Sequence, residues 1–154
     1  MNRPVLSAVL ICGDAHTGVL ARCLKSILDA PGGPACDELV LQFNGTSDAA
    51  FAAALHEVFG PLDGISDLPP LTPDIVTQFT HTTTDSQVVK VVVSRYTWQG
   101  DFAAARNAAH STATGEWHAY TDVDDLYVHP DHPAFLDSLE VDPPKAAVES
   151  YPVK

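Results

Sequence analysis

The hydrophobic residues of this 154-residue chain fall into short, nearly continuous runs that alternate with segments of helical periodicity. Residues 5–12 form the first run, which is apolar at almost every position and stops at Gly13-Asp14. Such a run is typical of a strand that is covered on both faces. Apolar residues then recur at helical spacing over 20–28, and Pro and Gly residues at 31–34 end that pattern. The chain is therefore predicted to open with a buried strand and an amphipathic helix.

The same alternation continues towards the C-terminus. Further strands are predicted at 38–43, 88–94, 117–121 and 147–151, and further helices at 51–59, 102–110 and 134–139. Between about 60 and 86 the pattern dissolves into Pro, Thr and Asp residues, which predicts an inserted surface loop. Strand–helix alternation predicts an α/β fold in which flanking helices cover a mostly parallel, twisted sheet.

Polar residues follow the predicted strands at their carboxyl ends, where open α/β sheets bind ligands. These polar groups are Gly13-Asp14, Asn44-Gly45, Ser94-Arg95 and the run from Asp122 to Asp125. Because the ends of parallel strands share one edge of the sheet, the four groups are expected to converge on a single site.

Composition and charge restrict the classes of ligand. The apolar content of 45% is ordinary for a globular protein of one domain, and the formal net charge is −12. This charge argues against nucleic acid and anionic membranes as partners, since both require a basic face. A phosphate ligand would need local positive charge from a metal ion or from backbone N–H groups.

The cysteines and the first apolar run bear on the cellular compartment. Cys12, Cys23 and Cys36 are odd in number and lack metal-finger or redox spacing, so their simplest role is that of small core residues. This usage favours a reduced, cytoplasmic setting. The run at 5–12 is too short for a membrane span, and no membrane span is expected.

The acidic motif Asp122-x-Asp124-Asp125 is the sharpest candidate for chemistry. Alternate residues of a strand point the same way, so Asp122 and Asp124 are expected to address one ligand. Neighbouring carboxylates repel unless a cation joins them, and oxygen ligands suit Mn²⁺ or Mg²⁺. Taken alone, so short a motif favours the alternative of an acidic, solvated turn.

Several ordered motifs share a wider pattern. WQGDFAAARN at 98–107 precedes ATGEW at 113–117 and the acidic motif, while LARCLKSI at 20–27 and DELV at 37–40 come earlier, followed by NGTSD. This order resembles the signature of the family 2 glycosyltransferases with the GT-A fold. The resemblance covers most of residues 5–125, apart from the Pro-rich loop.

The resemblance implies a Rossmann-like GT-A half for residues 1–125 that binds a sugar-nucleotide donor, with an incomplete acceptor half at 126–154. It implies metal-dependent transfer, with inversion, from a nucleotide sugar to an unidentified glycan, lipid or protein, with a UDP-sugar as the leading donor. The implied donor-binding residues are Cys12, Gly13, Asp14, Phe43, Asn44, Arg106, Asn107, Asp122 and Val123, and the implied metal ligands are Asp122 and Asp124.

Three of these positions keep simpler alternatives. Arg106 and Asn107 would otherwise be a surface ion-pair partner and a polar helix residue. Many family members carry an aspartate that reads uracil where this chain has Phe43. Phe43 would have to stack on the base instead, or the pocket would accept another nucleotide. Asp101, by contrast, is predicted to cap the helix that follows it.

The C-terminal region leaves the activity open. The resemblance implies that the catalytic base lies beyond residue 154. The alternatives to a complete glycosyltransferase are therefore a non-catalytic nucleotide-sugar-binding or interaction domain, or one fragment of a split or truncated enzyme. An unpaired strand at 147–151 would expose a sheet edge, which favours a homodimer or a partner chain.

Overall fold

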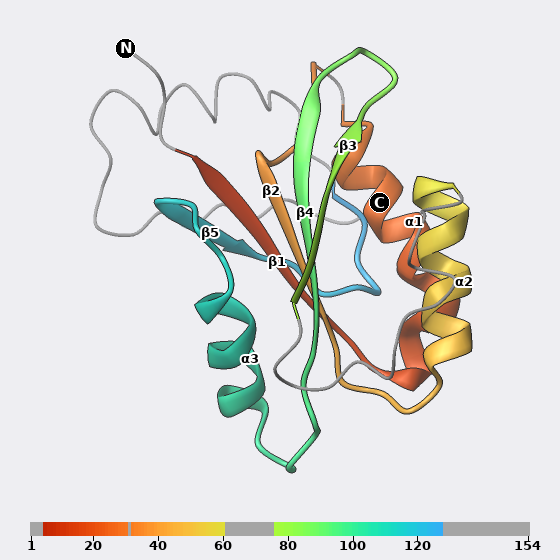
Figure 1. Ribbon diagram of the computed structural model, residues 1–154, viewed down its shortest axis with the longest axis vertical. Helices are drawn as coiled ribbons and strands as arrows, with labels where there is room; N and C mark the ends of the chain where they lie inside the picture. Colours follow the sequence, from red (N-terminus) through yellow and green to blue (C-terminus); the bar gives the residue numbers. More distant parts are fainter. Residues whose placement is uncertain (1–4, 31, 61–75, 128–154) are drawn as a thin grey trace.

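The computed structural model describes residues 5–30, 32–60 and 76–127, which form one five-stranded sheet with three α-helices around it (Figure 1). The helices are α1 (Thr17–Leu28), α2 (Asp48–Phe59) and α3 (Phe102–Ser111), and the strands are β1 (Leu6–Cys12), β2 (Glu38–Phe43), β3 (Val76–Thr82), β4 (Val88–Arg95) and β5 (Trp117–Tyr120). A short 3₁₀ turn, Asp14–His16, leads into α1. The predicted α/β class with a mostly parallel sheet is confirmed.

The order of the strands is β3-β4-β2-β1-β5. Strands β1, β2, β4 and β5 pair in parallel, whereas β3 pairs with β4 in the antiparallel sense. The chain moves outward from β1 through β2 to β4 and then returns to place β5 on the other side of β1. The direction in which strands are added therefore reverses between β1 and β5, and open α/β sheets bind ligands at the carboxyl end of such a reversal.

Helices cover both faces of the sheet. Alternate residues of β2 enter different cores: Leu39 and Leu41 pack under α1 and α2, and Val40 packs under α3. All residues of β1 and β2 are buried, which explains why β1 is apolar at almost every position and why β2 has an apolar centre. Figure 1 shows α1 and α2 together on one side of the sheet and α3 on the other.

The prediction of a surface loop over 60–86 is wrong for Val76–Thr82, because these residues form strand β3. Its side chains alternate between half-buried and exposed, and its large inward residue Phe79 packs edge-on against Phe59 with ring centroids 5.1 Å apart. The remaining positions are largely Thr, Gln and His, so the strand has little apolar signal. Residues 61–75 lie outside the described residues. The same holds for the helix predicted at 134–139 and the strand predicted at 147–151, and only residues 126 and 127 of the predicted acceptor half are described.

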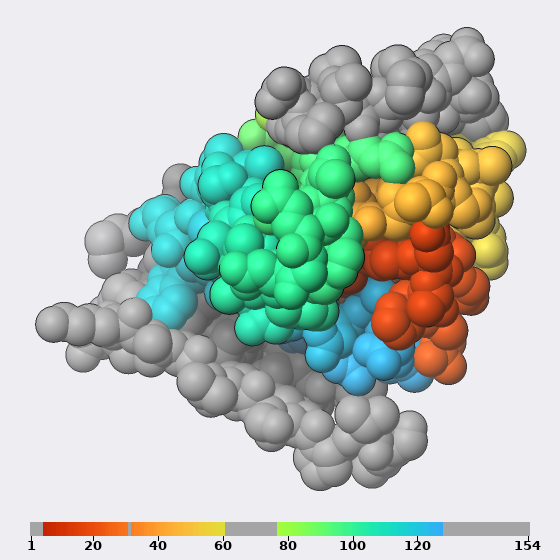
Figure 2. Space-filling model, turned by 90° about the horizontal axis from the view of Figure 1, so that it is seen from below, coloured from red at the N-terminus to blue at the C-terminus, as the bar shows by residue number. Residues whose placement is uncertain are grey.

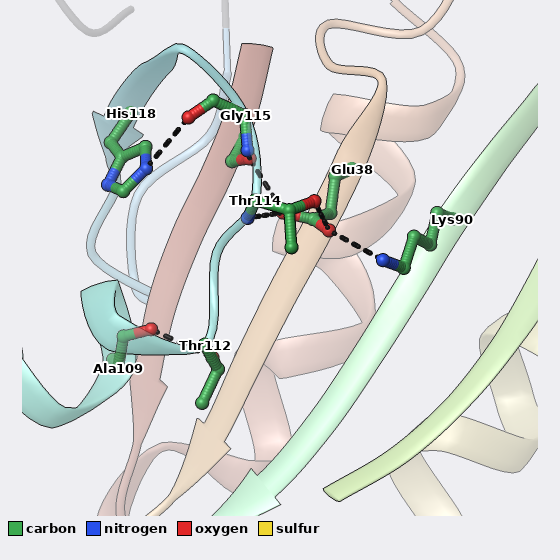
Figure 3. A network of polar contacts seen from close by, with 8 residues as sticks. Glu38, Lys90, Ala109, Thr112, Thr114, Gly115 and His118 are labelled. Carbon is green, nitrogen blue, oxygen red and sulfur yellow. Dashed lines mark hydrogen bonds and ion pairs between the residues drawn. The ribbon is translucent and has the colours of Figure 1, made fainter. Parts of the chain in front are cut away.

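A buried glutamate joins three segments of the sheet (Figure 3). Glu38 is only 1% exposed, and its carboxylate accepts hydrogen bonds of 2.7 Å from the Ser7 hydroxyl and from the backbone N–H and hydroxyl of Thr114. The Lys90 ammonium lies 3.3 Å away. Burial raises the pKa of Glu38, but these donors outweigh it and the pKa is lowered overall.

Gly115 completes this network. The Gly115 N–H donates a hydrogen bond to the Ser7 hydroxyl over 2.9 Å. A Cβ on Gly115 would lie 2.8 Å from the Val5 carbonyl oxygen, so no larger residue fits against β1. The ATGEW motif thus has a structural role, which is to hold the entry to β5 against β1 and β2.

We expect Glu38→Gln to lower the free energy of unfolding by about 1–3 kcal/mol at pH 7, since it weakens the buried hydrogen bonds that the carboxylate accepts from Ser7 and Thr114. Because the pKa of Glu38 is lowered in the fold, its contribution is present above the unfolded pKa of about 4.3 and is lost as pH falls. Urea denaturation from pH 7 to pH 3 should therefore show a shallower acid loss for the variant. Glu57→Gln, which alters the exposed pair with Lys25, is the control. Parallel acid curves for wild type and Glu38→Gln would contradict this account.

Candidate functional site

A cavity of about 490 Å³ opens at the carboxyl edge of the sheet. Its volume lies within the usual range for small-ligand sites. The lining residues come from the ends of β1 and β5, from the segments that follow β1, β2, β4 and β5, and from the first residue of α3: Ile11, Gly13, Asp14, Ala15, His16, Asn44, Gly45, Thr46, Trp98, Phe102, Tyr120, Asp122, Val123 and Asp124. Figure 2 looks at the molecule from below, with the blue segment that holds the acidic motif lying beside the red segment after β1. Three of the four predicted polar groups meet here, and Ser94-Arg95 does not line the cavity.

The acidic motif lies on a turn. Strand β5 ends at Tyr120, and the Asp125 N–H donates to the Asp122 carbonyl over 3.0 Å. This turn brings ligand atoms of Asp122, Asp124 and Asp125 within 4.8 Å of one another, and all three residues are exposed. Asp122 and Asp124 were expected to point the same way because they alternate along a strand. That reason is wrong, since both residues follow the strand, but the turn does bring their carboxylates together.

Contacts with α1 hold the acidic turn in place. Val123, between the acids, is 3% exposed and packs in the core, while also bordering the cavity. The Cys23 thiol donates to the Asp122 carbonyl over 3.7 Å, and the Tyr127 N–H donates to the Ser26 hydroxyl over 2.8 Å. Burial, with a further contribution from the nearby acids, raises the pKa of Cys23 to about 12, so this thiol stays protonated. The carboxylates are thus displayed on an anchored loop.

The donor set of this turn fits a hard divalent cation. Carboxylate oxygens at this spacing repel one another in the absence of a positive charge, and they suit Mg²⁺ and Mn²⁺ as ligands. Asp122 and Asp124 line the cavity, so an ion held between them would lie within reach of a ligand bound there.

Asp14 fastens the loop after β1 to the loop after β2. Its carboxylate accepts from the N–H of Thr46 at 2.9 Å, from the Thr46 hydroxyl at 2.8 Å and from the N–H of Ser47 at 2.8 Å. These hydrogen bonds lower the pKa of Asp14, with the Ser47 N–H contributing most. Asp14 borders the cavity as predicted, but its carboxylate is occupied by the neighbouring turn.

Two predicted donor-binding residues lie in the core. Phe43 is fully buried and stacks on Phe51, with ring centroids 4.4 Å apart and planes 12° apart. Cys12 is also fully buried, and burial, aided by Asp14, raises the pKa of its thiol to about 12. Neither side chain lines the cavity, so the structure does not bring Phe43 to a position where it would stack on a ligand.

Helix α3 presents Arg106 to the aromatic wall of the cavity. The Asp101 side chain accepts from the Ala104 N–H over 3.1 Å, which confirms the predicted cap. The Arg106 guanidinium carbon lies 4.0 Å from the ring centroid of Tyr120, which lines the cavity. The pKa of Tyr120 is raised, first by burial and then by a hydrogen bond to Asp122. Arg106 therefore acts on the site through Tyr120, and the exposed Asn107 does not border the cavity.

Eight cavity residues were not among the predicted site residues: Ile11, Ala15, His16, Gly45, Thr46, Trp98, Phe102 and Tyr120. Two of them, Trp98 and Phe102, are 45% and 52% exposed and meet edge-on with ring centroids 5.7 Å apart. An exposed aromatic pair is a recognisable signal for a binding surface. In the sequence, both residues belong to the WQGDFAAARN motif, which does not reveal that they border the same cavity as the acidic turn.

Comparison of the chain with protein-family models found no match, and a search of curated proteins found no significant match. Among the described residues, the helices are too short and too polar for any of them to traverse a lipid bilayer.

We expect Gly45→Ala to lower the free energy of unfolding by about 1–3 kcal/mol, the usual cost of overpacking. A Cβ at Gly45 would meet the Asp14 carboxylate and would lie 2.6 Å from Phe43 Cζ, so the loop contact must open. Gly13→Ala is the matched control, because a Cβ there meets nothing within 4 Å. Thermal and urea unfolding measure both variants. Equal stability of the two would show that the Asp14 contact tolerates the added methyl.

Proposed function

We propose that this chain binds a nucleoside diphosphate sugar together with Mn²⁺ or Mg²⁺ and serves as the donor-binding part of a glycosyltransferase. The observation that carries the proposal is the position of the acidic turn, whose three carboxylates gather together and two of whose acids, Asp122 and Asp124, line a ligand-sized cavity. An acidic protein needs such an arrangement to attract a diphosphate. The ordered motifs of the sequence supply the rest of the proposal, including the GT-A type of fold and a UDP-sugar as donor.

Each wall of the cavity has its own task in this proposal. Asp122 and Asp124 hold the ion, and Tyr120, supported by Arg106, orients the Asp122 side chain. The ion supplies positive charge that stabilises the departing diphosphate. Trp98 and Phe102 offer exposed aromatic surface against which a flat ring of the ligand can pack.

Product formation separates an enzyme from a binding domain. A general base must deprotonate the acceptor hydroxyl in the inverting transfer that we propose. No described residue is assigned to that role. Sugar transfer or donor hydrolysis by the chain would support the enzyme, and tight binding without turnover would favour the non-catalytic alternative. The three cysteines are free and buried, which agrees with the reduced, cytoplasmic compartment that we propose.

We expect calorimetry to detect binding of UDP or GDP, and of their sugars, in Mn²⁺ or Mg²⁺ but not in EDTA, because the carboxylates repel a diphosphate when no cation joins them. Asp124→Ala should abolish the metal-dependent binding. Asp29→Ala, which removes an exposed acid at the end of α1, keeps the same change in net charge and should bind normally. Equal binding in EDTA, or no binding of any nucleotide, would refute the proposed function.

A further inference from the structure

Two histidines from different elements point the same ring nitrogen at each other. His110 lies in the last turn of α3, and His118 lies in β5. Their Nδ1 atoms are 2.9 Å apart, their ring centroids are 5.1 Å apart, and their ring planes differ by 7°. His110 is half-buried, His118 is exposed, and neither residue lines the cavity. The two imidazoles are therefore a solvent-accessible pair of metal-ligating groups outside the candidate site.

A hydrogen bond to the backbone fixes the tautomer of His118. Its Nε2 lies 3.1 Å from the Gly115 carbonyl oxygen (Figure 3). A carbonyl only accepts, so Nε2 carries the proton, and Nδ1 of the neutral ring keeps its lone pair. His110 then supplies the proton of the contact between the two Nδ1 atoms. Metal-bound histidines have the arrangement that His118 shows, with one nitrogen free for the ion and the other donating to a carbonyl or carboxylate.

The carbonyl that orients His118 belongs to a fixed part of the backbone. The Gly115 N–H donates to the Ser7 hydroxyl over 2.9 Å, and this hydroxyl donates to the buried Glu38 carboxylate over 2.7 Å. The His118 ring is therefore oriented before any ion binds, and a preorganised ligand loses less conformational freedom on binding.

The spacing of the two rings fits one tetrahedral ion. With Zn–N bonds of about 2.0–2.1 Å, a tetrahedral ion places two imidazole nitrogens about 3.3 Å apart and the ring centroids about 5.2 Å apart. The centroids of His110 and His118 are already 5.1 Å apart. A small rotation of the rings opens the 2.9 Å gap between the nitrogens. The His110 proton moves from Nδ1 to Nε2, which is the other neutral tautomer, so both Nδ1 atoms then present lone pairs.

The surroundings keep His110 in the form that binds metals. Burial, followed by the neighbouring His118 and Arg106, lowers the pKa of His110, and neutral imidazole is the metal ligand. Arg106 is the cation that acts on this ring, and its guanidinium lies over the rings of Tyr120 and Phe102, 4.0 and 5.4 Å from their centroids. The negative faces of these rings offset part of the Arg106 charge beside the pair.

We propose that His110 and His118 form a zinc site, separate from the acidic turn, in which both Nδ1 atoms bind one Zn²⁺ and water fills the remaining positions. Imidazole nitrogens suit Zn²⁺, whereas carboxylate oxygens suit Mg²⁺ and Mn²⁺. The ion joins the end of α3 to β5 and stabilises the folded state, because only folding brings the two ligands together. The site goes beyond the proposed function and does not depend on it.

Calorimetry with ZnCl₂ on the full chain, in excess Mg²⁺ to occupy the acidic turn, tests the site. We expect one Zn²⁺ to bind per chain and to raise the midpoint of thermal unfolding. His118→Ala should weaken this binding about tenfold or more, since even substitutions next to metal ligands cost that much. Asp124→Ala should bind Zn²⁺ as the wild type does. His56→Ala, which removes an exposed histidine of α2, is the matched control.

A second variant and a spectroscopic measurement keep the test sharp where His118→Ala fails to fold. His110→Gln keeps a polar side chain beside His118 but has no imidazole, so it should weaken Zn²⁺ binding by a similar factor. In ¹⁵N NMR spectra of the imidazoles, one equivalent of Zn²⁺ should shift the Nδ1 signals of His110 and His118 before those of the other histidines.

The outcomes distinguish this site from other places where zinc could bind. Absence of Zn²⁺ binding, unchanged binding in both histidine variants, or NMR shifts confined to other histidines would overturn the proposal and leave the pair as an ordinary hydrogen bond. Loss of Zn²⁺ binding in Asp124→Ala would assign the ion to the acidic turn and would also overturn it. Nucleotide binding in Mg²⁺ or Mn²⁺ is a separate measurement, so the proposed function stands or falls independently.

Discussion

The burial of β1 on both faces and both edges constrains the rest of the structure. All of its residues, Leu6–Cys12, are buried, and it pairs with β2 and β5 in parallel. A strand in that position has no room for an unpaired charge, because burying one costs far more than a lost hydrogen bond. Polar side chains are therefore displaced to the ends of the strands, and the parallel arrangement collects those ends at one edge. The cavity lies there for this reason.

The exceptions in the sheet interior are informative. Glu38 and Gln42 are long polar side chains on β2, and both are 1% exposed. Each makes more than one hydrogen bond, and each connects the sheet to a segment far away in the sequence. Glu38 accepts from Thr114 before β5, and Gln42 donates to the Ala105 carbonyl in α3. Buried polar groups that are fully paired specify a unique arrangement more strictly than apolar packing does. They orient the loops and helices that surround the cavity.

Two sets of acidic side chains among the described residues differ in how their charge is compensated. The carboxylates of Asp14 and Glu38 are satisfied by N–H and O–H donors of the protein itself, and their pKa values are lowered accordingly. The three acids of the turn after β5 are exposed and gathered together, and two of them, Asp122 and Asp124, line the cavity. Among the described residues, this set has the geometry to engage a cation, so the net charge of −12 is less informative than the place where these acids meet.

Hydrophobic patterning by itself determined the α/β class, the buried strands β1, β2 and β4, and the helices between them, because a strand covered on both faces leaves an unmistakable apolar run. It missed β3, whose single large apolar side chain leaves almost no signal at the edge of the sheet. Strand-end logic also indicated that Gly13, Asp14, Asn44 and the acidic motif would meet. Only the tertiary structure decided which atoms face the cavity. It buried Phe43 against Phe51, engaged Asp14 with Thr46, and brought Trp98 and Phe102 to the site, since side-chain direction depends on contacts between segments far apart in the chain.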